Sequence, residues 1–442
     1  DARKALSAAT TEAEKETNGG KLVLNVWRKG KTMPATLTLP VKGTYSASSP
    51  WDCEKTSVII DEAAQSILEK GFFSGNRAGN QVARGGIGDF LDALGLLATG
   101  EDKHLPAVRD YARAVAKKSE SLDIMGEEGI GTWHGGYKNL FLTEYYLATK
   151  DEQVLPGITA LSTYLALGQS GVGTWSHGMA DVRQNGFYGP ACAYGAMNSC
   201  SLTCAISLLL AQKCGIETKE IDDAVQRSLT FFRWYVDKGC IPYGDHSPAH
   251  WHDNNGKNSQ AAVLFDLAGN RAAATYFTGM ALASHPQRER GHTGHFFSWQ
   301  WGALGAARGG PAAAQSFVEN TRWFTEMERR PDGGSVYQNQ LDNQDHSKYK
   351  NWSTTGSRLL QHCLPRQKLF ITGKGGSCVD PIAGGDLEAV VAAAKFSPEG
   401  RSVEELLEAL GSWSLIVRQK AAIELGKRDE DVVAELIAML DS

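Results

Sequence analysis

"GYKNLFLTEYYLA" (136–148) and "VRDYARAVAKKSE" (108–120) together decide the fold of this chain. Both stretches carry apolar residues at the i, i+3 and i+4 spacing of an α-helix. The first has almost no charge, which predicts a helix buried on all sides. The second has a charged face, which predicts a helix in contact with water on that side. Alternation of the two kinds indicates two layers of helices.

The alternation continues from residue 53 to residue 363, where the sequence lacks strand patterns. Six amphipathic segments are expected to form an outer layer: 54–70, 103–119, 151–168, 218–237, 270–284 and 311–329. Six segments rich in Gly, Ala and aromatic residues are expected to form an inner layer: 86–99, 136–149, 191–213, 257–268, 296–308 and 353–363. Six such pairs predict one ring of helices inside another, a mainly α, (α/α)6 toroid.

The turns after three outer segments share glycines next to Trp or Tyr: "GIGTWHGG" (129–136), "GVGTWSHG" (171–178) and "RPDGGSVY" (330–337). Turns of this kind resemble those of the α/α-toroid superfamily, which includes terpene cyclases and protein prenyltransferases. The resemblance implies the fold rather than the activity. The cyclases' DxDD acid is absent, and the only close Asp–Cys pairing, at 52–53, lies outside these turns. Isoprenoid chemistry is therefore disfavoured.

Two smaller segments flank the predicted toroid. Residues 1–45 read as a helix, "KLVLNVWRKG" (21–30), a turn and "TMPATLTLPV" (32–41). This order resembles the C-terminal part of a PDZ domain in periplasmic trypsin-like proteases, where R-x-G-K joins the last two strands. Residues 364–386 are rich in Gly, Pro and Asp and read as a linker. Residues 387–442, with "WSLIVRQKAAIELGKRDEDVVAELIAML" (413–440), resemble a HEAT-type helix pair.

The order of PDZ-like, toroid and HEAT-like segments resembles an uncharacterised bacterial protein family. The likeness lies in "LPVKGTYSASSPWDCEKT" (39–56), "NGKNSQAAVLFDLAGN" (255–270), "GHTGHFFSWQWG" (291–302) and "LFITGK" (369–374). It implies an architecture but no activity. Protein partners are expected at the PDZ-like or the HEAT-like segment.

Composition excludes several classes of protein. The 442 residues are 42% hydrophobic and carry a net charge of -5, which argues against a nucleic-acid partner. No apolar run reaches the roughly 18 residues of a membrane helix. The first residues lack the pattern of a signal peptide. The eight cysteines form no CxxC pair and read as buried apolar residues, so they leave the compartment open. The protease-like PDZ segment favours a periplasmic or exported protein.

Function is expected in the connections from outer to inner segments, which are long: 71–85, 120–135, 169–190, 238–256, 285–295 and 330–352. We call these the long links; the opposite connections are short. In a toroid all long links emerge at one end of the ring, where loops on a rigid scaffold usually carry function. Of the 11 histidines, nine lie in long links. We expect the main cavity there, with Tyr137, Tyr145, Tyr194 and Trp299 as its floor.

"YGDHSPAHWHDNNGKN" (243–258) is the richest of these links. Paired acid–base groups predict a catalytic set of His250, His252, Asp253, His292, His295 and Asp332. Aromatic, imidazole and guanidinium groups predict a substrate-binding set of Trp133, His134, Trp175, His177, Trp251, Tyr243 and Arg183. Two simpler interpretations stay open. Asp253, Asn254 or Asn255 is a natural cap for the helix that follows, and Asp332 is a natural turn residue.

A polar, ring-bearing ligand suits this composition, and a glycan is favoured. The predicted activity is that of a glycoside hydrolase or polysaccharide lyase. Two alternatives are retained. A binding scaffold for glycans or peptides would show aromatic residues without a coupled acid–base pair. A metal-dependent enzyme would use the imidazoles of "HWH" (250–252) and "HTGH" (292–295) to bind Zn²⁺ or another transition metal. No other cofactor is expected.

Overall fold

The structure is a computed structural model and describes residues 1–72, 86–121, 131–180, 195–248, 251–253, 255–289, 296–338 and 352–440. Helices dominate these residues, and the predicted mainly α fold class is confirmed. The sheet in the described part is a single antiparallel hairpin of β1 (Lys21–Arg28) and β2 (Lys31–Thr38). Among the helices of these residues, none has the length and apolar character needed to cross a bilayer.

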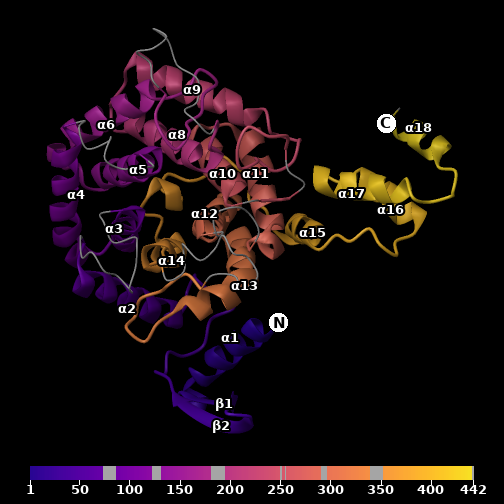
Figure 1. The fold of residues 1–442 in the computed structure, drawn as a ribbon, viewed down its shortest axis with the longest axis horizontal. Coiled ribbons are helices and arrows are strands. Elements are labelled where there is room, and N and C mark those ends of the chain that lie inside the picture. The colour runs from indigo at the N-terminus through magenta and orange to yellow at the C-terminus, as the bar shows by residue number, and fades with distance from the viewer. Residues whose placement is uncertain are drawn as a thin grey trace.

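Six helices pack side by side at the centre of the molecule (Figure 1). Each contacts the next in chain order and the last contacts the first, so that the cycle closes. They are α3 (Ile87–Thr99), α5 (Gly131–Thr149), α8 (Asn198–Lys213), α10 (Lys257–Leu267), α12 (Phe296–Ala306) and α14 (Thr355–His362). We call this set the inner ring. Its apolar side chains form one continuous core with those of the helices around it.

A second set of helices surrounds the inner ring (Figure 1). Each of these outer helices contacts at least one inner helix. They are α2 (Glu54–Lys70), α4 (Leu105–Ser119), α6 (Leu155–Leu167), α9 (Lys219–Arg233), α11 (Arg271–Ala283) and α13 (Gly310–Glu328). Their charged faces point away from the ring, as the amphipathic pattern predicts.

Glycines allow the inner helices to approach closely. A Cβ atom on Gly356 of α14 would lie 2.2 Å from the carbonyl oxygen of Leu91 in α3. A Cβ atom on Gly305 of α12 would lie 2.6 Å from the Cα of Ser259 in α10. Neither distance can accommodate a side chain, so the high glycine content of the inner segments is a requirement of helix packing.

The observed helix bounds agree with the predicted ones to within about four residues, with two exceptions. The segment predicted at 191–213 forms a helix only from Asn198, because residues 195–197 are not helical. The sequence predicts that α5 begins at residue 136, but it begins at Gly131. Trp133 and His134 therefore lie on the first turn of a helix and not in a loop. The glycines at 135 and 136 suggested a turn, yet Gly136 faces α8, where a Cβ would meet the Cys204 sulfur at 3.0 Å.

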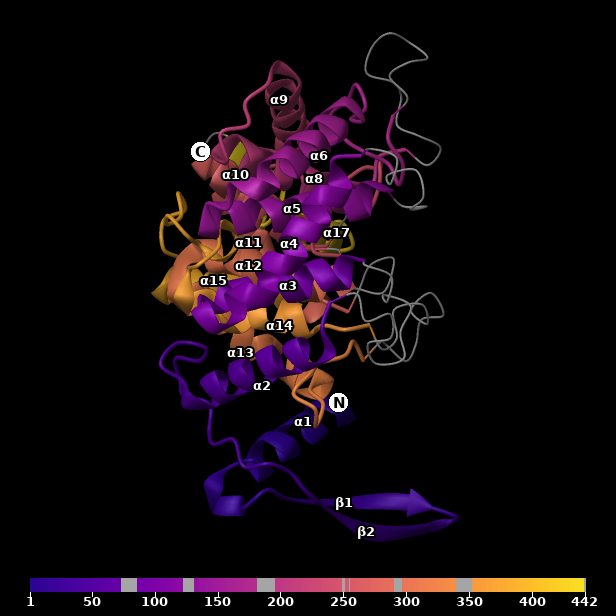
Figure 2. The ribbon, with the colours of Figure 1, turned by 90° about the vertical axis from the view of Figure 1, so that its left-hand side faces the viewer.

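The N-terminal unit packs on the outer layer through buried charges. Helix α1 (Ala2–Ala13) contacts α13, and the hairpin extends away from the ring (Figure 2). The buried Glu14 carboxylate lies 2.7 Å from the Lys55 ammonium and 2.7 Å from the Arg329 guanidinium. The Tyr45 ring lies between Lys55 and Arg322, at 4.7 and 4.4 Å. These charges are paired, so the contact is compatible with burial.

Four C-terminal helices lie beside the ring, on the side of α11: α15 (Gly384–Ala394), α16 (Val403–Leu410), α17 (Leu415–Leu425) and α18 (Val433–Leu440) (Figure 1). Helix α15 contacts α11, and α16 pairs with α17. Ala283 of α11, Ala393 of α15 and Val417 of α17 form a small shared core. The Trp413 ring covers Gly279 of α11, where a Cβ would lie 3.2 Å from the indole.

The first part of the predicted linker is packed across the end of the ring at which the inner helices terminate. We call this the short-link end. The main-chain N–H groups of Phe370 and Ile371 donate to the Glu144 carboxylate at 3.0 and 2.8 Å. The Arg308 guanidinium donates to the carbonyl oxygens of the same two residues and pairs with Asp266 at 3.0 Å. Burial raises the pKa of Glu144 to about 7.

Candidate functional site

The inner helices all begin at the opposite end of the ring, where the long links join them. We call this the long-link end. The helices run parallel: Thr132 contacts Cys200 near the start of α5 and α8, and Cys214 contacts the Thr143 carbonyl near their far ends. Six helix N-termini therefore face one side of the molecule. Their exposed N–H groups and dipoles favour negative charge there.

A tryptophan–histidine pair stands at this end. The indole N–H of Trp133, on the first turn of α5, donates a hydrogen bond to Nδ1 of His177 at 3.0 Å. An indole nitrogen can only donate, so Nδ1 must accept and the ring proton must sit on Nε2. His177 is half-buried and Trp133 is buried. The pair therefore presents a neutral imidazole with a fixed Nε2–H donor.

The segment that carries His177 is held from two inner helices. Thr132 of α5 donates its main-chain N–H to the His177 carbonyl at 3.2 Å. Ser201 of α8 accepts the N–H of Trp175 at 2.8 Å and donates to the Trp175 carbonyl. The Trp175 indole is buried and donates to the Leu165 carbonyl at 2.9 Å. Trp175 thus anchors the segment and has no face available for a ligand in this arrangement.

Aromatic rings from two inner helices meet beside Trp133. The Phe297 ring of α12 lies 4.8 Å from Trp133 and 5.8 Å from Tyr137. The Tyr137 hydroxyl accepts a hydrogen bond from the Trp301 indole at 2.8 Å and lies 3.4 Å from the Gln300 side-chain oxygen. Burial raises the pKa of Tyr137, so its hydroxyl keeps its proton. We call Trp133, Tyr137, Phe297 and His177 the aromatic cluster.

The predicted floor agrees with the structure only in part. Tyr137 lies in the aromatic cluster, as expected. The Trp299 ring stacks on Phe324 of α13 at 3.9 Å and faces the outer layer. The Tyr145 hydroxyl donates to Asp151 at 2.8 Å, close to the short-link end. Tyr194 lies outside the described residues. Tyr137 and Tyr145 lie more than two helix turns apart along α5. This distance is too great for both side chains to line the same end of the ring.

Besides His177, three residues of the predicted substrate-binding set are half-buried: His134, Tyr243 and Trp251. His134 follows Trp133 on the first turn of α5. Tyr243 is fixed through its main chain, because the N–H of Asn198 at the start of α8 donates to its carbonyl at 3.1 Å. Trp251 packs against the main core. All three lie close to the starts of inner helices, so their role in binding stays a prediction that the geometry permits.

His252 contacts the C-terminal helices. Its Nε2 lies 2.8 Å from the Ser414 hydroxyl, which caps the N-terminus of α17. Its ring is 6.3 Å from the Trp413 ring. Burial lowers the pKa of His252 to about 3, so the imidazole is neutral at physiological pH. The predicted catalytic role of His252 remains untested, but its observed contacts join the ring to the C-terminal helices.

Asp253 is buried and caps α10. Its carboxylate accepts the N–H of Asn258 at 2.9 Å and the hydroxyl of Ser259 at 2.7 Å. The buried Arg288 guanidinium lies 3.1 Å from the same carboxylate. The capping interpretation considered for Asp253 is therefore what the structure contains. A carboxylate with these partners is stabilised as an anion, and any catalytic role stays a prediction.

Asp332 lies in an exposed turn. It accepts the N–H of Gly334 at 3.1 Å and pairs with the Lys70 ammonium at 2.9 Å. Hydrogen bonds and charge from Lys70 lower its pKa in spite of some burial. These contacts fix the turn, as the simpler interpretation of "PDGG" expects.

The remaining predicted site residues lie outside the described residues: His250, His292, His295 and Arg183. The predicted meeting of His250, His252 and Asp253 with His292 and His295 lies outside them too. Within the described ranges, no group of three or more His, Cys, Asp or Glu side chains could hold a metal ion. The cysteines of the described ranges form no disulfide bond.

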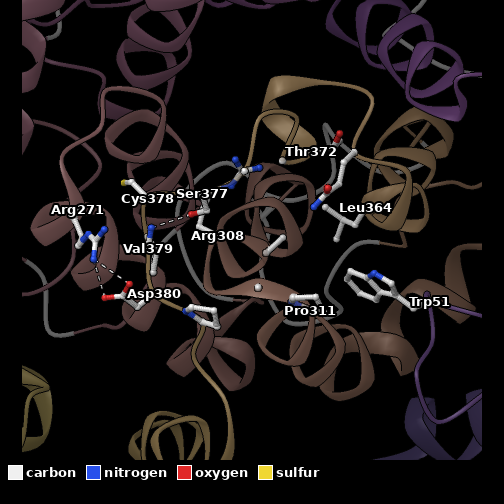
Figure 3. A pocket seen from close by; sticks show the side chains of 16 residues that line it. Trp51, Arg271, Arg308, Pro311, Leu364, Thr372, Ser377, Cys378, Val379 and Asp380 are labelled. Atoms are coloured by element: carbon white, nitrogen blue, oxygen red, sulfur yellow. Dashed lines mark hydrogen bonds and ion pairs between the residues drawn. The ribbon is translucent and has the colours of Figure 1, made fainter.

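A cavity of about 310 Å³ lies at the short-link end (Figure 3). Trp51, Pro311 and Leu364 supply apolar walls, and the Arg271–Asp380 ion pair, at 3.0 Å, stands at its edge. A space of about 10 Å³ lies between α2 and the described start of the long link 330–352. Many of the other long-link residues lie outside the described residues, so the main cavity expected at the long-link end stays a prediction. The packed segment 364–381, taken for a linker, creates the cavity at the short-link end.

Lys257 is the residue that the sequence should have singled out. It is the first residue of α10 and the one basic residue of "KNSQAAVLFDL" (257–267), a segment otherwise read as buried. The structure buries it completely beside Tyr243, whose ring centre lies 5.9 Å from the ammonium nitrogen. A lysine in a segment predicted to be inaccessible to water is a signal, because burial of an amine needs a reason.

Comparison with known proteins identifies a family but no activity. A family model described as "Domain of unknown function (DUF6288)" matches residues 57–373. No curated protein and no solved structure matches the chain. The match lies outside 1–45 and 387–442, so the PDZ-like and HEAT-like resemblances stay predictions. Because the matched segment covers more than half of the sequence, the chain belongs to the DUF6288 family.

Proposed function

We propose that this chain is a glycan-processing protein of the (α/α)6 toroid class with its site at the long-link end. One observation carries the proposal: the Trp133–His177 hydrogen bond set against the Phe297 ring. The half-buried His177 offers a saccharide a hydrogen-bond donor, and the buried Trp133 and Phe297 hold its imidazole in a fixed orientation. The closed cycle of contacts in the inner ring supports the toroid assignment.

His177 supports a reaction as well as binding. Its Nε2–H can donate to a sugar hydroxyl or to a glycosidic oxygen. A hydrogen bond from this neutral imidazole stabilises the negative charge that develops on the leaving oxygen, and another group supplies the proton that the oxygen takes up. This assists both hydrolysis, in which water adds across the broken bond, and β-elimination, in which a ring proton leaves and a double bond forms. A second group must accept a proton. The imidazoles of His250, His292 and His295 remain the proposed candidates for this role.

A glycan array followed by calorimetry on the full chain tests the proposal. We expect the wild type to bind a saccharide and Trp133→Phe to weaken that binding about tenfold, as the loss of one ordered hydrogen bond predicts. Trp234→Phe is the matched control, because this tryptophan is exposed beyond the end of α9. An array without any bound saccharide would overturn the glycan proposal.

Product analysis separates an enzyme from a binding protein. Hydrolysis gives products heavier by one water per broken bond, whereas β-elimination gives an unsaturated sugar that absorbs ultraviolet light. We expect one of these products and its loss in His177→Ala. Binding with neither product would leave a glycan-binding scaffold as the function.

A second candidate function, binding of a protein segment, is favoured by a groove on the C-terminal helices. The groove has a volume of about 560 Å³ and is lined by Ala392, Phe396 and Trp413, with Glu405 and Glu408 of α16 exposed at its edge. Residues 384–440 contain eleven acidic and six basic residues. Apolar walls with an acidic edge suit a basic amphipathic helix.

A synthetic lysine-rich amphipathic peptide tests this second function. Fluorescence anisotropy should show binding to the full chain, and a glutamate-rich peptide of the same apolar pattern should not bind. Charge reversal with Glu405→Lys and Glu408→Lys should exchange the two preferences. Equal binding of both peptides would argue against recognition by the groove.

A further inference from the structure

Lys257 lies at the same end of the ring as the aromatic cluster. It follows Gly256, which has a φ of +76° and no room for a side chain, because a Cβ there would lie 2.5 Å from the Phe297 carbonyl oxygen. The main chain at 256–257 is therefore in contact with α12 at Phe297. The Phe297 ring in turn lies 4.8 Å from Trp133. Contacts thus run continuously from Lys257 to the Trp133–His177 pair.

The Lys257 side chain has no exposed surface. In the described part of the chain, its ammonium donates no hydrogen bond, and the centre of the Tyr243 ring lies 5.9 Å from it. The Asp253 carboxylate acts on it electrostatically but is already bound by Arg288, Asn258 and Ser259. Burial lowers the pKa of Lys257 to about 8, so much of the amine is still charged at neutral pH.

Two further effects make this position unfavourable for a cation alone. Lys257 is the first residue of α10, where the helix dipole repels positive charge. Side chains on a helix also lean toward its N-terminus, which brings the ammonium closer to that end. A buried lysine in this position is therefore destabilising unless a negative group binds it.

Lys55 shows how the same chain buries a lysine for stability. Its side chain is as inaccessible as that of Lys257, but its ammonium lies 2.7 Å from the Glu14 carboxylate and 4.7 Å from the Tyr45 ring. For Lys55, the chain itself therefore supplies the anion, the Glu14 carboxylate, that pairs with the buried ammonium. Lys257 has the aromatic neighbour, Tyr243, and lacks the anion.

We propose that Lys257 binds the anionic group of the ligand and that the saccharide at this site is acidic, bearing a carboxylate or a sulfate. The inference rests on the proposed glycan function and narrows it to one class of sugar. A negative group beside Lys257 would pair with the ammonium and with the positive N-terminus of α10. The half-buried His177 would donate a hydrogen bond to a neighbouring sugar ring.

Calorimetry with two matched probes tests the inference on the full chain. One probe is a uronate tetrasaccharide; the other is the same tetrasaccharide with each carboxylate reduced to a hydroxymethyl group. We expect the wild type to bind the acidic probe at least about tenfold more tightly, as a charge-assisted contact predicts. Lys257→Met keeps the apolar stem and should remove this preference while leaving the affinity for the neutral probe. A preference that survives in Lys257→Met would overturn the inference.

A measurement on the wild type alone covers the case in which Lys257→Met does not fold. Affinity for the acidic probe should fall as the pH rises through about 8, whereas affinity for the neutral probe should not change. If the affinities for the acidic and the neutral probe change with pH in the same way, the inference is wrong.

The two proposals can fail separately. If neither tetrasaccharide binds, the glycan function is lost, and inorganic sulfate at millimolar concentration then probes the anion site. Sulfate that stabilises the wild type more than Lys257→Met would keep an anion site without a saccharide. If sulfate stabilises the wild type and Lys257→Met equally, Lys257 does not form an anion site.

Discussion

The Trp133 indole N–H donates to Nδ1 of His177 at 3.0 Å, and this single contact fixes the imidazole as the neutral tautomer with its proton on Nε2. Protonation of Nδ1 would place two donors against each other. His177 is therefore suited to donate a hydrogen bond without taking up charge, a property that a solvent-exposed histidine lacks.

Trp133→Phe should release the imidazole from this tautomer. The phenyl ring can still pack on Phe297, so we expect a loss of about 1 kcal/mol in the free energy of unfolding, the usual effect of one hydrogen bond. Nitrogen chemical shifts of His177 should report a single tautomer in the wild type and a mixture in the variant. A wild type that already shows both tautomers would contradict the assignment.

Asp253 and Asp332 should respond very differently to removal. Asp253→Ala leaves the buried Arg288 without its anion and uncaps α10, and we expect a loss of about 3–5 kcal/mol in unfolding free energy. Asp332→Ala breaks an exposed pair with Lys70, and we expect less than about 1 kcal/mol. Urea denaturation of both variants measures the difference. Equal effects would show that Asp253 is not the structural anion described above.

Acid should destabilise the fold through three buried histidines. Burial lowers the pKa of His252 and His362 to about 3 and that of His285 to about 4. The unfolded chain takes up protons below a pH of about 6.5, while the folded chain does not, so each histidine contributes stability that is complete above that pH and is lost as the pH falls toward 4 and 3. Each can remove up to about 1.4 kcal/mol per pH unit.

Glu144 acts in the opposite direction, because its pKa is raised to about 7 and its contribution declines as the pH rises toward that value. With three histidines against one glutamate, urea midpoints should fall between a pH of about 7 and a pH of about 5. In His362→Asn, the urea midpoint should fall less between these two pH values, because one buried histidine is removed. Midpoints that do not change over this range would contradict the prediction.

His252→Ala should loosen the C-terminal helices more than the ring. The change removes the partner of the Ser414 hydroxyl and opens space beside Trp413, with an expected cost of about 2 kcal/mol. Hydrogen exchange should rise in α15–α17 and stay low in α5 and α8. His104→Ala is the matched control, since it removes a buried histidine bonded to Thr99 at 2.8 Å and far from α17. If hydrogen exchange in His252→Ala rises as much in α5 and α8 as in α15–α17, or if His104→Ala gives the same pattern, His252 does not hold the C-terminal helices on the ring.

The helices could be predicted because the same spacing of apolar residues recurs in one segment after another. Each inner and outer segment carries its own apolar period, and bounds such as those of α2 and α12 follow from it almost to the residue. The position of His252 was not predictable in the same way. Its partner, Ser414, is far along the chain, and no local pattern indicates which of several histidines a distant helix will cover.

Asp253 and Lys257 show that prediction from sequence is limited even for residues that are close together in the chain. The capping of α10 by Asp253 could be anticipated from spacing, and it was one of the interpretations left open. The sequence signalled Lys257 as the one basic residue of a segment predicted to be buried. It did not show whether the ammonium itself is buried, because a lysine at the start of a helix usually reaches solvent. The structure shows that the side chain is fully buried beside Tyr243.

Glu144 and Arg308 hold the main chain of Phe370 and Ile371 across the short-link end, and this has a consequence for the form of any polymer the protein handles. The ring is closed on that side, so the site proposed at the long-link end would have a single entrance. A polysaccharide could not be threaded through the ring and processed while sliding. The proposed site would instead take a chain terminus, a side branch or a short oligomer, which would leave by the route through which it entered.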